Sequence, residues 1–302
     1  MRRGLWTAIL LALLLTSVVG LQALRERGGA LTAAPGTVLY VQSPAALERM
    51  ALSYHSLLAD LYWIRAVQHY GNTKLGRGAD RSYALLYPLL DLTTSLDPYF
   101  AVAYQFGALF LAEVPPGGPG RPDQAITLLE KGIKAQPDAW RLYQAVGFVH
   151  YWSRQDYASA ADWFRRASQV PGAPTWMEPL AAVTLAEGGN RQGSRVLWQQ
   201  ILKTETDDWF RSEAERRLKQ LDAMDQRDAL RRVVAAFATR QGRAPASWAE
   251  LAQAGYVRGA LVDPAGSPYR LDDGAVALDP KSPLLPLPQE SGPRHPGIRP
   301  PL

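Results

Sequence analysis

The chain has 302 residues, of which 47% are hydrophobic and 10% aromatic, and this is enough apolar material for a sizeable core in one or two domains. It contains no cysteine, which excludes disulfides, thiolate metal sites and thiol nucleophiles. The formal net charge of +5 is compatible with nucleic acid or an anionic membrane surface, but it indicates neither by itself.

The first predicted element is an apolar segment from Leu5 to Leu24 that contains no charged residue. A helix of this length is about 30 Å long, the thickness of the hydrocarbon core of a bilayer. We therefore expect residues 1–27 to be a transmembrane anchor, and a cleaved signal peptide ending near Gly20 is the alternative. Two arginines lie on each side of the segment, so the α-amino group and Glu26 favour an inside amino terminus. The bulk of the chain is then expected on the periplasmic or extracytoplasmic side of a bacterial inner membrane.

Residues 28–43 are rich in Gly, Ala, Pro and Thr and are expected to be a linker. From residue 44 to residue 242, apolar residues recur at spacings of three and four, and Gly or Pro interrupts the pattern at regular intervals. This pattern predicts a series of short, paired helices.

Two stretches of this region repeat one pattern. In "LDPYFAVAYQFGALFLAE" and "AQPDAWRLYQAVGFVHYW" a Pro precedes a Gly by nine or ten residues, and a second helix follows each stretch. The second helices carry a small, a large and a small residue at spacings of four and three: Ala125, Leu129 and Gly132 in one, and Ala160, Phe164 and Ala167 in the other. We expect the small residues to let paired helices approach closely, and Phe164 to fill the space toward the next helix.

This pattern resembles the tetratricopeptide repeat, a helix pair of about 34 residues. The resemblance implies a mainly α fold, an α-helical solenoid with repeats at 100–137 and 138–173, degenerate repeats on either side, and a capping helix from about Asp207 to Gln241. In this family the first helices line a groove that binds a peptide. The positions that match that surface are Tyr104, Gln144, Phe148, Tyr151 and Trp152. The alternative for the aromatic members is that they pack between repeats.

Residues 243–281 break the helical pattern and predict a small α+β module. A short helix is expected after an N-cap at Ser247, with Glu250 at the capping-box position. "PYRL" and "GAVAL" are expected to pair as a hairpin around a turn at 272–274. Residues 282–302 are rich in proline and are expected to be a disordered tail.

The module resembles the carboxyl-terminal part of the type II secretion major pseudopilin. The matching residues are Leu251, Gly255, Tyr256, Asp263, Pro264, Gly266, Pro268 and Tyr269. The calcium-binding loop of that family has no counterpart that aligns, so the resemblance implies no metal here.

The common catalytic and cofactor-binding motifs are absent from the sequence. It contains no G-x-S-x-G, H-E-x-x-H, phosphate-loop or dinucleotide-binding pattern, so no catalytic residue, cofactor or metal is predicted. His55 and His69 are fourteen residues apart, about 21 Å along one helix, and cannot share a metal. The arginines between Asp207 and Gln241 alternate with acidic residues, which favours a solvated helix with intrahelical pairs over a nucleic-acid surface.

These features together predict a membrane-anchored scaffold that is not an enzyme. It is expected to hold a protein or peptide partner at the outer face of the cytoplasmic membrane, and the pseudopilin-like module suggests assembly of a secretion or type IV pilus-like complex. One alternative is a groove that binds a lipid or a polysaccharide. Another is a hydrolase whose site contains Asp263, Asp272 and Asp273. The partner's identity and the oligomeric state stay open.

Overall fold

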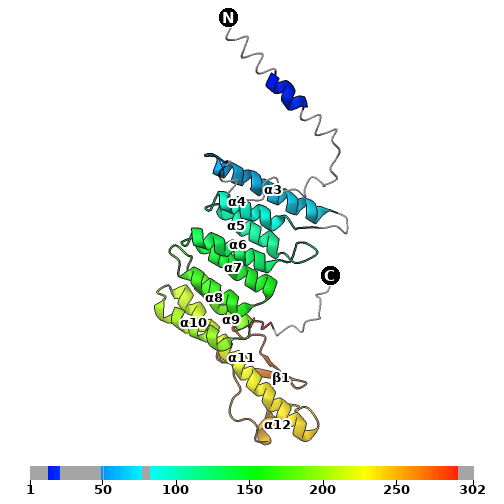
Figure 1. The fold of residues 1–302 in the computed structure, drawn as a ribbon. Helices are drawn as coiled ribbons and strands as arrows, with labels where there is room; N and C mark the ends of the chain where they lie inside the picture. Colours follow the sequence, from blue (N-terminus) through cyan, green and yellow to red (C-terminus); the bar gives the residue numbers. More distant parts are fainter. Residues whose placement is uncertain (1–12, 21–48, 50, 77–81, 292–302) are drawn as a thin grey trace. The chain divides into compact units, whose positions relative to one another are not determined.

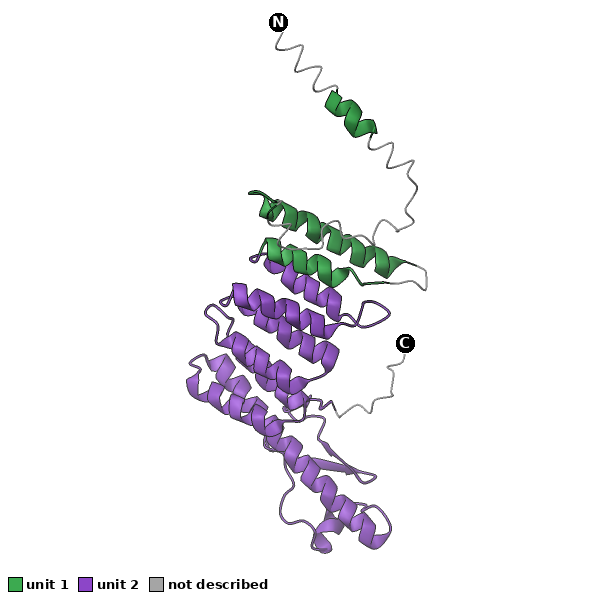
Figure 2. Cartoon of the chain, viewed as in Figure 1, with its two compact units in different colours: residues 1–97 green, residues 98–302 purple. Residues whose placement is uncertain are grey.

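The computed structural model describes residues 13–20, 49, 51–76 and 82–291, and the fold is mainly α-helical, as predicted (Figure 1). The chain divides into two compact units, residues 1–97 and 98–302, which Figure 2 shows in two colours. The helical region predicted as one array at 44–242 therefore contributes to both units.

The first unit contains a pair of helices, α3 (His55–Leu75) and α4 (Leu86–Leu96), which pack against each other. α3 buries the small Ala59 and Ala66, and α4 buries a row of leucines. α3 ends at Leu75, where Gly76 donates its backbone N–H to the carbonyl of Asn72 at 3.0 Å.

The predicted anchor and linker lie mostly outside the described residues, although residues 13–20 are helical. In the described part of the chain, no helix combines the length and the apolar character that crossing a membrane requires.

The second unit begins with helices that pack on their neighbours in chain order (Figure 1). They are α5 (Ala101–Ala112), α6 (Pro122–Ala135), α7 (Trp140–Phe148), the π-helix η1 (Val149–Arg154), α8 (Tyr157–Ser168), α9 (Met177–Glu187), α10 (Arg191–Thr204) and α11 (Asp208–Gln241). The side chains of Asp156, Asn190 and Asp207 accept backbone N–H groups at the starts of α8, α10 and α11, which explains where these helices begin.

The small residues of the repeated pattern are buried where helices approach closely, as predicted. A Cβ atom on Gly132 of α6 would lie 2.9 Å from the ring of Tyr104 in α5, and one on Gly147 would overlap the ring of Phe164. Ala160 and Ala167 are fully buried. Phe164 belongs to a core that continues into α9 and α10, but it also fills the space within its own pair, against Gly147 of α7.

The α+β module contains a short helix, α12 (Trp248–Gln253), and an antiparallel hairpin of β1 (Tyr269–Asp272) and β2 (Ala275–Leu278). Asp273 and Gly274 form the two-residue turn, and both have positive φ, as a turn of type I′ requires. The hairpin lies within one residue of its predicted position: Asp272 belongs to β1 and pairs with Ala275, and Gly274 belongs to the turn.

Two expectations about the module's surroundings are corrected. Ser247 caps α12 by accepting the N–H of Glu250, but the Glu250 carboxylate accepts the N–H of Ala246 instead of completing the capping box. The module also shares a core with the second half of α11, because Val234 and Phe237 are buried with residues of α12, β1 and β2. α11 is therefore the base on which the module folds, in addition to covering α10.

Residues 282–291 are ordered, so the predicted disordered tail is wrong for this part of it. Leu284 is buried, and the buried Gln220 of α11 donates to the carbonyl oxygens of Leu284 and Pro286 at 2.7 and 2.9 Å. The N–H of Ser291 donates to the carbonyl of Glu187 at 2.8 Å. Burial of one leucine and one amide thus fixes a segment whose composition resembles that of disordered chains; residues 292–302 lie outside the described part.

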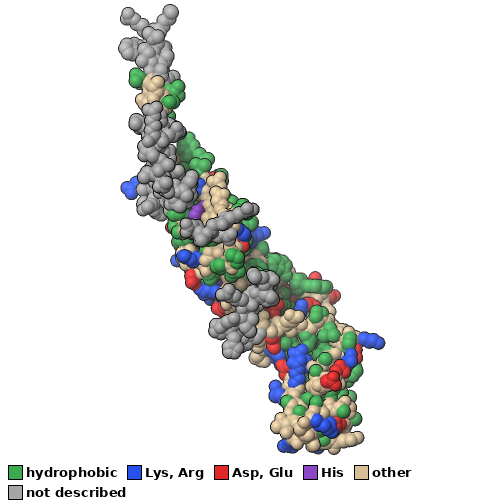
Figure 3. Space-filling model, turned by 90° about the vertical axis from the view of Figure 1, so that its right-hand side faces the viewer, with side chains coloured by type: hydrophobic (Ala, Val, Ile, Leu, Met, Phe, Trp, Pro, Cys, Tyr) green, Lys and Arg blue, Asp and Glu red, His purple; other side chains and the backbone are tan. Residues whose placement is uncertain are grey.

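The acidic residues of α11 make many of their ion pairs across to α10. Arg191 lies 2.8 Å from Asp225 and 2.6 Å from Glu290, and Arg195 pairs with Asp222 and Asp225. Intrahelical pairs also occur, as between Glu213 and Arg217. Basic and acidic side chains are interspersed over the part of the molecule that contains α11 on the face drawn in Figure 3.

Candidate functional site

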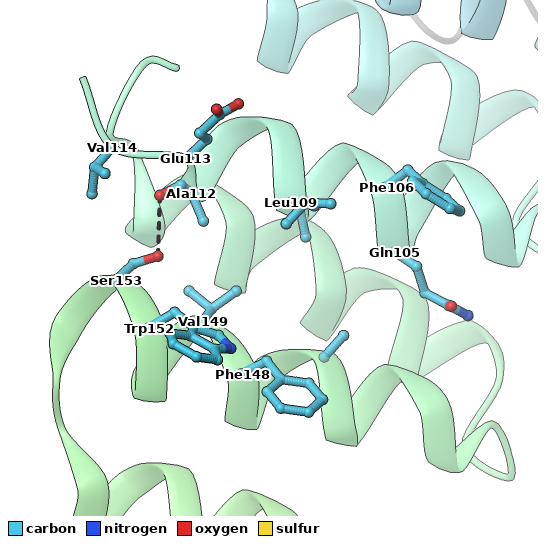
Figure 4. Close-up of a pocket in the computed structure, with 12 residues that line it drawn as sticks. Gln105, Phe106, Leu109, Ala112, Glu113, Val114, Phe148, Val149, Trp152 and Ser153 are labelled. Carbon is cyan, nitrogen blue, oxygen red and sulfur yellow. Dashed lines mark hydrogen bonds between the residues drawn. The ribbon is translucent and has the colours of Figure 1, made fainter. Parts of the chain in front are cut away.

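A pocket of about 480 Å³ lies within the second unit, between α5 and the continuous α7–η1 segment (Figure 4). Its lining is largely apolar. The residues that line it are Gln105, Phe106, Ala108, Leu109, Ala112, Glu113, Val114, Ala145, Phe148, Val149, Trp152 and Ser153.

The pocket lies where equivalent positions of two successive helix pairs, α5–α6 and α7–α8, carry side chains of different size. When Gly107 is aligned with Gly147, the alanines at 108 and 112 of α5 match Phe148 and Trp152. The alanines leave space on one wall, and the two aromatic rings, four residues apart on one helical face, form the other (Figure 4). Large side chains at positions 108 and 112 would occupy this space.

The π-helix η1 holds Trp152 in place through contacts at its carboxyl-terminal end. Ser153 Oγ donates to the carbonyl of Ala112, at the end of α5, at 3.0 Å (Figure 4). Arg154 forms an ion pair with Asp123 of α6. Gln155 then ends the segment in the left-handed region, at φ 54°. π-helical turns are often found at functional sites, and this one presents Trp152 to the pocket.

The predicted groove residues divide into three groups. Phe148 and Trp152 line the pocket and are 37% and 70% exposed. Gln144 and Tyr151 are half-buried and are not among the lining residues. Tyr104 is fully buried against Gly132, so no partner can contact it from the surface. The prediction that Tyr104 is exposed in the groove is therefore wrong. Tyr104 is a core residue, in line with the alternative that the aromatic residues pack between helices.

The α5 side of the pocket was missed, and the sequence does contain a signal for it. Phe106, Leu109 and Val114 line the pocket and are exposed. α5 contains no charged residue and is apolar on nearly every side, as expected for a helix that has contacts on more than its core face. Tyr104, the residue of α5 that was predicted to line the groove, precedes the lining residue Gln105 by one position and so points about 100° away from it around the helix.

Tyr151 connects the pocket to the end of α9. Its hydroxyl donates to the Glu187 carboxylate at 2.6 Å, and its ring packs edge-on against the rings of Trp152 and Tyr157, with centroids 4.9 and 5.3 Å away. Burial, followed by the hydrogen bond to Glu187, raises the pKa of Tyr151 above its usual value. The hydroxyl is therefore protonated at neutral pH and remains a donor to Glu187.

The chemistry that this pocket offers is apolar contact and ring stacking. Glu113 is the charged member of its lining, while Gln105 and Ser153 supply neutral polar groups. Among the residues that the structure describes, no group of three or more His, Cys, Asp or Glu side chains could hold a metal. The pocket is thus suited to binding an apolar group.

Two of the aspartates of the α+β module, Asp263 and Asp272, make contacts within the module. Asp263 is buried, and its carboxylate accepts the N–H groups of Ala265 and Ser267, both at 2.9 Å, and the hydroxyl of Ser282 at 2.5 Å. Asp272 pairs with Arg270 at 3.1 Å. The Asp263 carboxylate is therefore occupied in shaping the loop before β1 and in holding the start of the 282–291 segment.

Comparisons with protein-family models, curated proteins and solved structures find no match to this chain.

Proposed function

We propose that this protein is a membrane-anchored scaffold of tetratricopeptide-like helix pairs that binds a protein or peptide partner in the pocket between α5 and α7–η1. The anchor is residues 5–24, and the bulk of the chain then lies at the outer face of the cytoplasmic membrane. A role in assembling a secretion or type IV pilus-like complex rests on the pseudopilin-like sequence of the module alone. In this proposal the protein acts by binding and not by catalysis.

One observation carries the proposal: Phe148 and Trp152 are exposed in an apolar pocket that opens between two consecutive helix pairs. Pockets with exposed aromatic rings are typical centres of binding energy in protein interfaces, where one buried tryptophan contributes about 2 kcal/mol or more. A partner that inserts an apolar side chain would bury Trp152 and Phe148 together. Loss of about 2 kcal/mol corresponds to a roughly thirtyfold weaker complex.

The test is photo-crosslinking in living cells with benzoylphenylalanine in place of Phe148. We expect one dominant polypeptide adduct, and we expect Trp152→Ser in the same chain to abolish it. The matched control is Trp209→Ser, because Trp209 is 67% exposed, close to the 70% of Trp152, but is not among the residues that line the pocket. Absence of any adduct, or an adduct that survives Trp152→Ser, would contradict the proposal.

The apolar lining gives one alternative ligand a specific basis, namely the acyl chain of a lipid. A polysaccharide fits less well, because the lining has few polar groups. Native mass spectrometry of the purified, delipidated protein distinguishes a lipid ligand from a peptide ligand. A bound small molecule that is lost with Trp152→Ser and kept with Trp209→Ser would favour the lipid over the peptide.

A further inference from the structure

The segment 282–291 ends at the carboxyl-terminal end of α9. It is held at the start by the contacts of Gln220 and Leu284, and near its end by Glu290, which pairs with Arg191 at 2.6 Å. The last described residue, Ser291, donates its N–H to the carbonyl of Glu187 at 2.8 Å. The described part of the chain therefore ends at the carboxyl-terminal end of α9.

Glu187 also contacts Tyr151, the neighbour of the pocket residue Trp152. Its carboxylate accepts the Tyr151 hydroxyl at 2.6 Å, and the ring of Tyr151 lies 4.9 Å from that of Trp152. Two residues, Glu187 and Tyr151, thus connect Ser291 to Trp152 through successive contacts. Eleven residues, 292–302, follow Ser291 and span up to about 36 Å when extended, at about 3.3 Å per residue. They are long enough to reach across the pocket.

The chemistry of "GPRHPGIRPPL" fits that of the pocket. Four of its eleven residues are prolines, and Ile298 and Leu302 add apolar side chains. Proline-rich segments lose little entropy when they bind, and they dock in grooves lined by aromatic rings, such as Trp152 and Phe148 provide. The segment carries two arginines and no acidic residue, whereas the charged residue of the pocket lining is Glu113.

We propose that residues 292–302 occupy the pocket of their own chain when no partner is bound, so that a partner must displace them. Tethering makes this feasible for a weak contact, because a short covalent connection gives an effective concentration in the millimolar range. An intrinsic dissociation constant of about 1 mM then leaves the pocket about half occupied. The inference uses the pocket of the proposed function but requires no external partner.

Disulfide trapping in the purified full chain tests this contact, since the protein has no cysteine of its own. Val114→Cys places a thiol at the exposed rim of the pocket, and Ile298→Cys places one in the segment. Under mild oxidation, in which the added oxidant takes up the two hydrogen atoms of the thiols, we expect an intrachain disulfide, detected as a chain that stays monomeric and yields a 114–298 linked peptide. The matched control pairs Ile298→Cys with Val196→Cys, at an exposed valine of α10 outside the lining. We expect the pocket pair to form its bond at least about tenfold faster.

A third variant separates specific docking from simple proximity. Trp152→Ser, added to the Val114→Cys and Ile298→Cys pair, removes the exposed ring but leaves the tether unchanged, so the rate should fall to that of the Val196 control. Equal rates for the two cysteine pairs, or a rate that does not depend on Trp152, would overturn the inference. Cellular crosslinking at Phe148 tests the proposed partner separately. A Trp152-dependent adduct without the disulfide would overturn only the intrachain contact. The disulfide without an adduct would overturn only the binding of a partner.

Discussion

Gly147 of α7 and Phe164 of α8 are in such close contact that a Cβ atom on Gly147 would lie 2.6 Å from Cδ1 of Phe164. Phe148, the next residue, stacks edge-on against the same ring, with centroids 5.2 Å apart. The packing of one helix pair therefore sets the position of a residue that lines the pocket. Changes at this contact should affect both stability and binding.

The first prediction concerns Gly147→Ala. Overpacking against Phe164 costs about 1 to 3 kcal/mol, and we expect this cost to exceed the gain of about 0.5 to 1 kcal/mol from replacing glycine in a helix. Chemical denaturation should show a lower free energy of unfolding for this variant. The control is Gly71→Ala in α3, where a Cβ meets no atom within 4 Å, and it should stabilise by about 0.5 to 1 kcal/mol. A stabilising Gly147→Ala would contradict the close packing.

Ala160→Leu tests the predicted small position of α8. Ala160 is fully buried, so the larger side chain should destabilise the protein by about 1 to 3 kcal/mol through overpacking. Ala158→Leu in the same helix is the matched control, because Ala158 is exposed and its substitution should change stability by less than about 0.5 kcal/mol. Thermal melts of the two variants compare them directly, and equal melting temperatures would remove the small-residue explanation.

Gln220→Ala should release the 282–291 segment from α11. The substitution leaves the carbonyls of Leu284 and Pro286 without their buried donor, which costs about 1 to 3 kcal/mol. Hydrogen exchange followed by mass spectrometry should show faster exchange in residues 284–290 while α5 to α8 stay unchanged. Gln200→Ala, at an exposed position of α10, serves as the control. Unchanged exchange in the segment would show that other contacts hold it.

Asp225→Asn should make the free energy of unfolding depend less on pH in the acidic range. Burial by itself raises the pKa of the Asp225 carboxyl, but hydrogen bonds from Arg191 and Arg195 outweigh this and hold the pKa below its ordinary value. A depressed pKa means that the stabilisation is present above about pH 4, the pKa of an unfolded aspartate, and is lost as the pH falls through the lower folded value.

The measurement is the free energy of unfolding between about pH 6 and pH 2. The difference between the wild type and Asp225→Asn should be largest at the upper end of this range and should vanish at the lower end. Solvent screening keeps it small, because Asp225 is about half exposed. Asp138→Asn, at an exposed position, is the control. A difference that grows as the pH falls would contradict the sign.

Much of the fold could be predicted from local patterns. The cap at Asp207, the hairpin turn at Asp273 and Gly274, and the small residues facing Phe164 are each encoded within one or two neighbouring elements. Of the five groove residues predicted from the sequence, Phe148 and Trp152 line the pocket. Tyr104 was misplaced because its role depends on which face of α5 meets α6, and a helix advances about 100° with each residue.

The amino-acid sequence by itself determined the helical class, the pairing of helices through small residues, and the hairpin of the α+β module, because these follow from periodicity, capping and turn chemistry over short distances. Only the tertiary structure decided that α5 forms the second wall of the pocket, that Asp225 pairs with α10, and that residues 282–291 are ordered. Those outcomes depend on contacts between residues far apart in the chain, such as Gln220 with Leu284 and Arg191 with Glu290. Burial and ion pairing at such distances are set by the packing of whole elements, which no local pattern records.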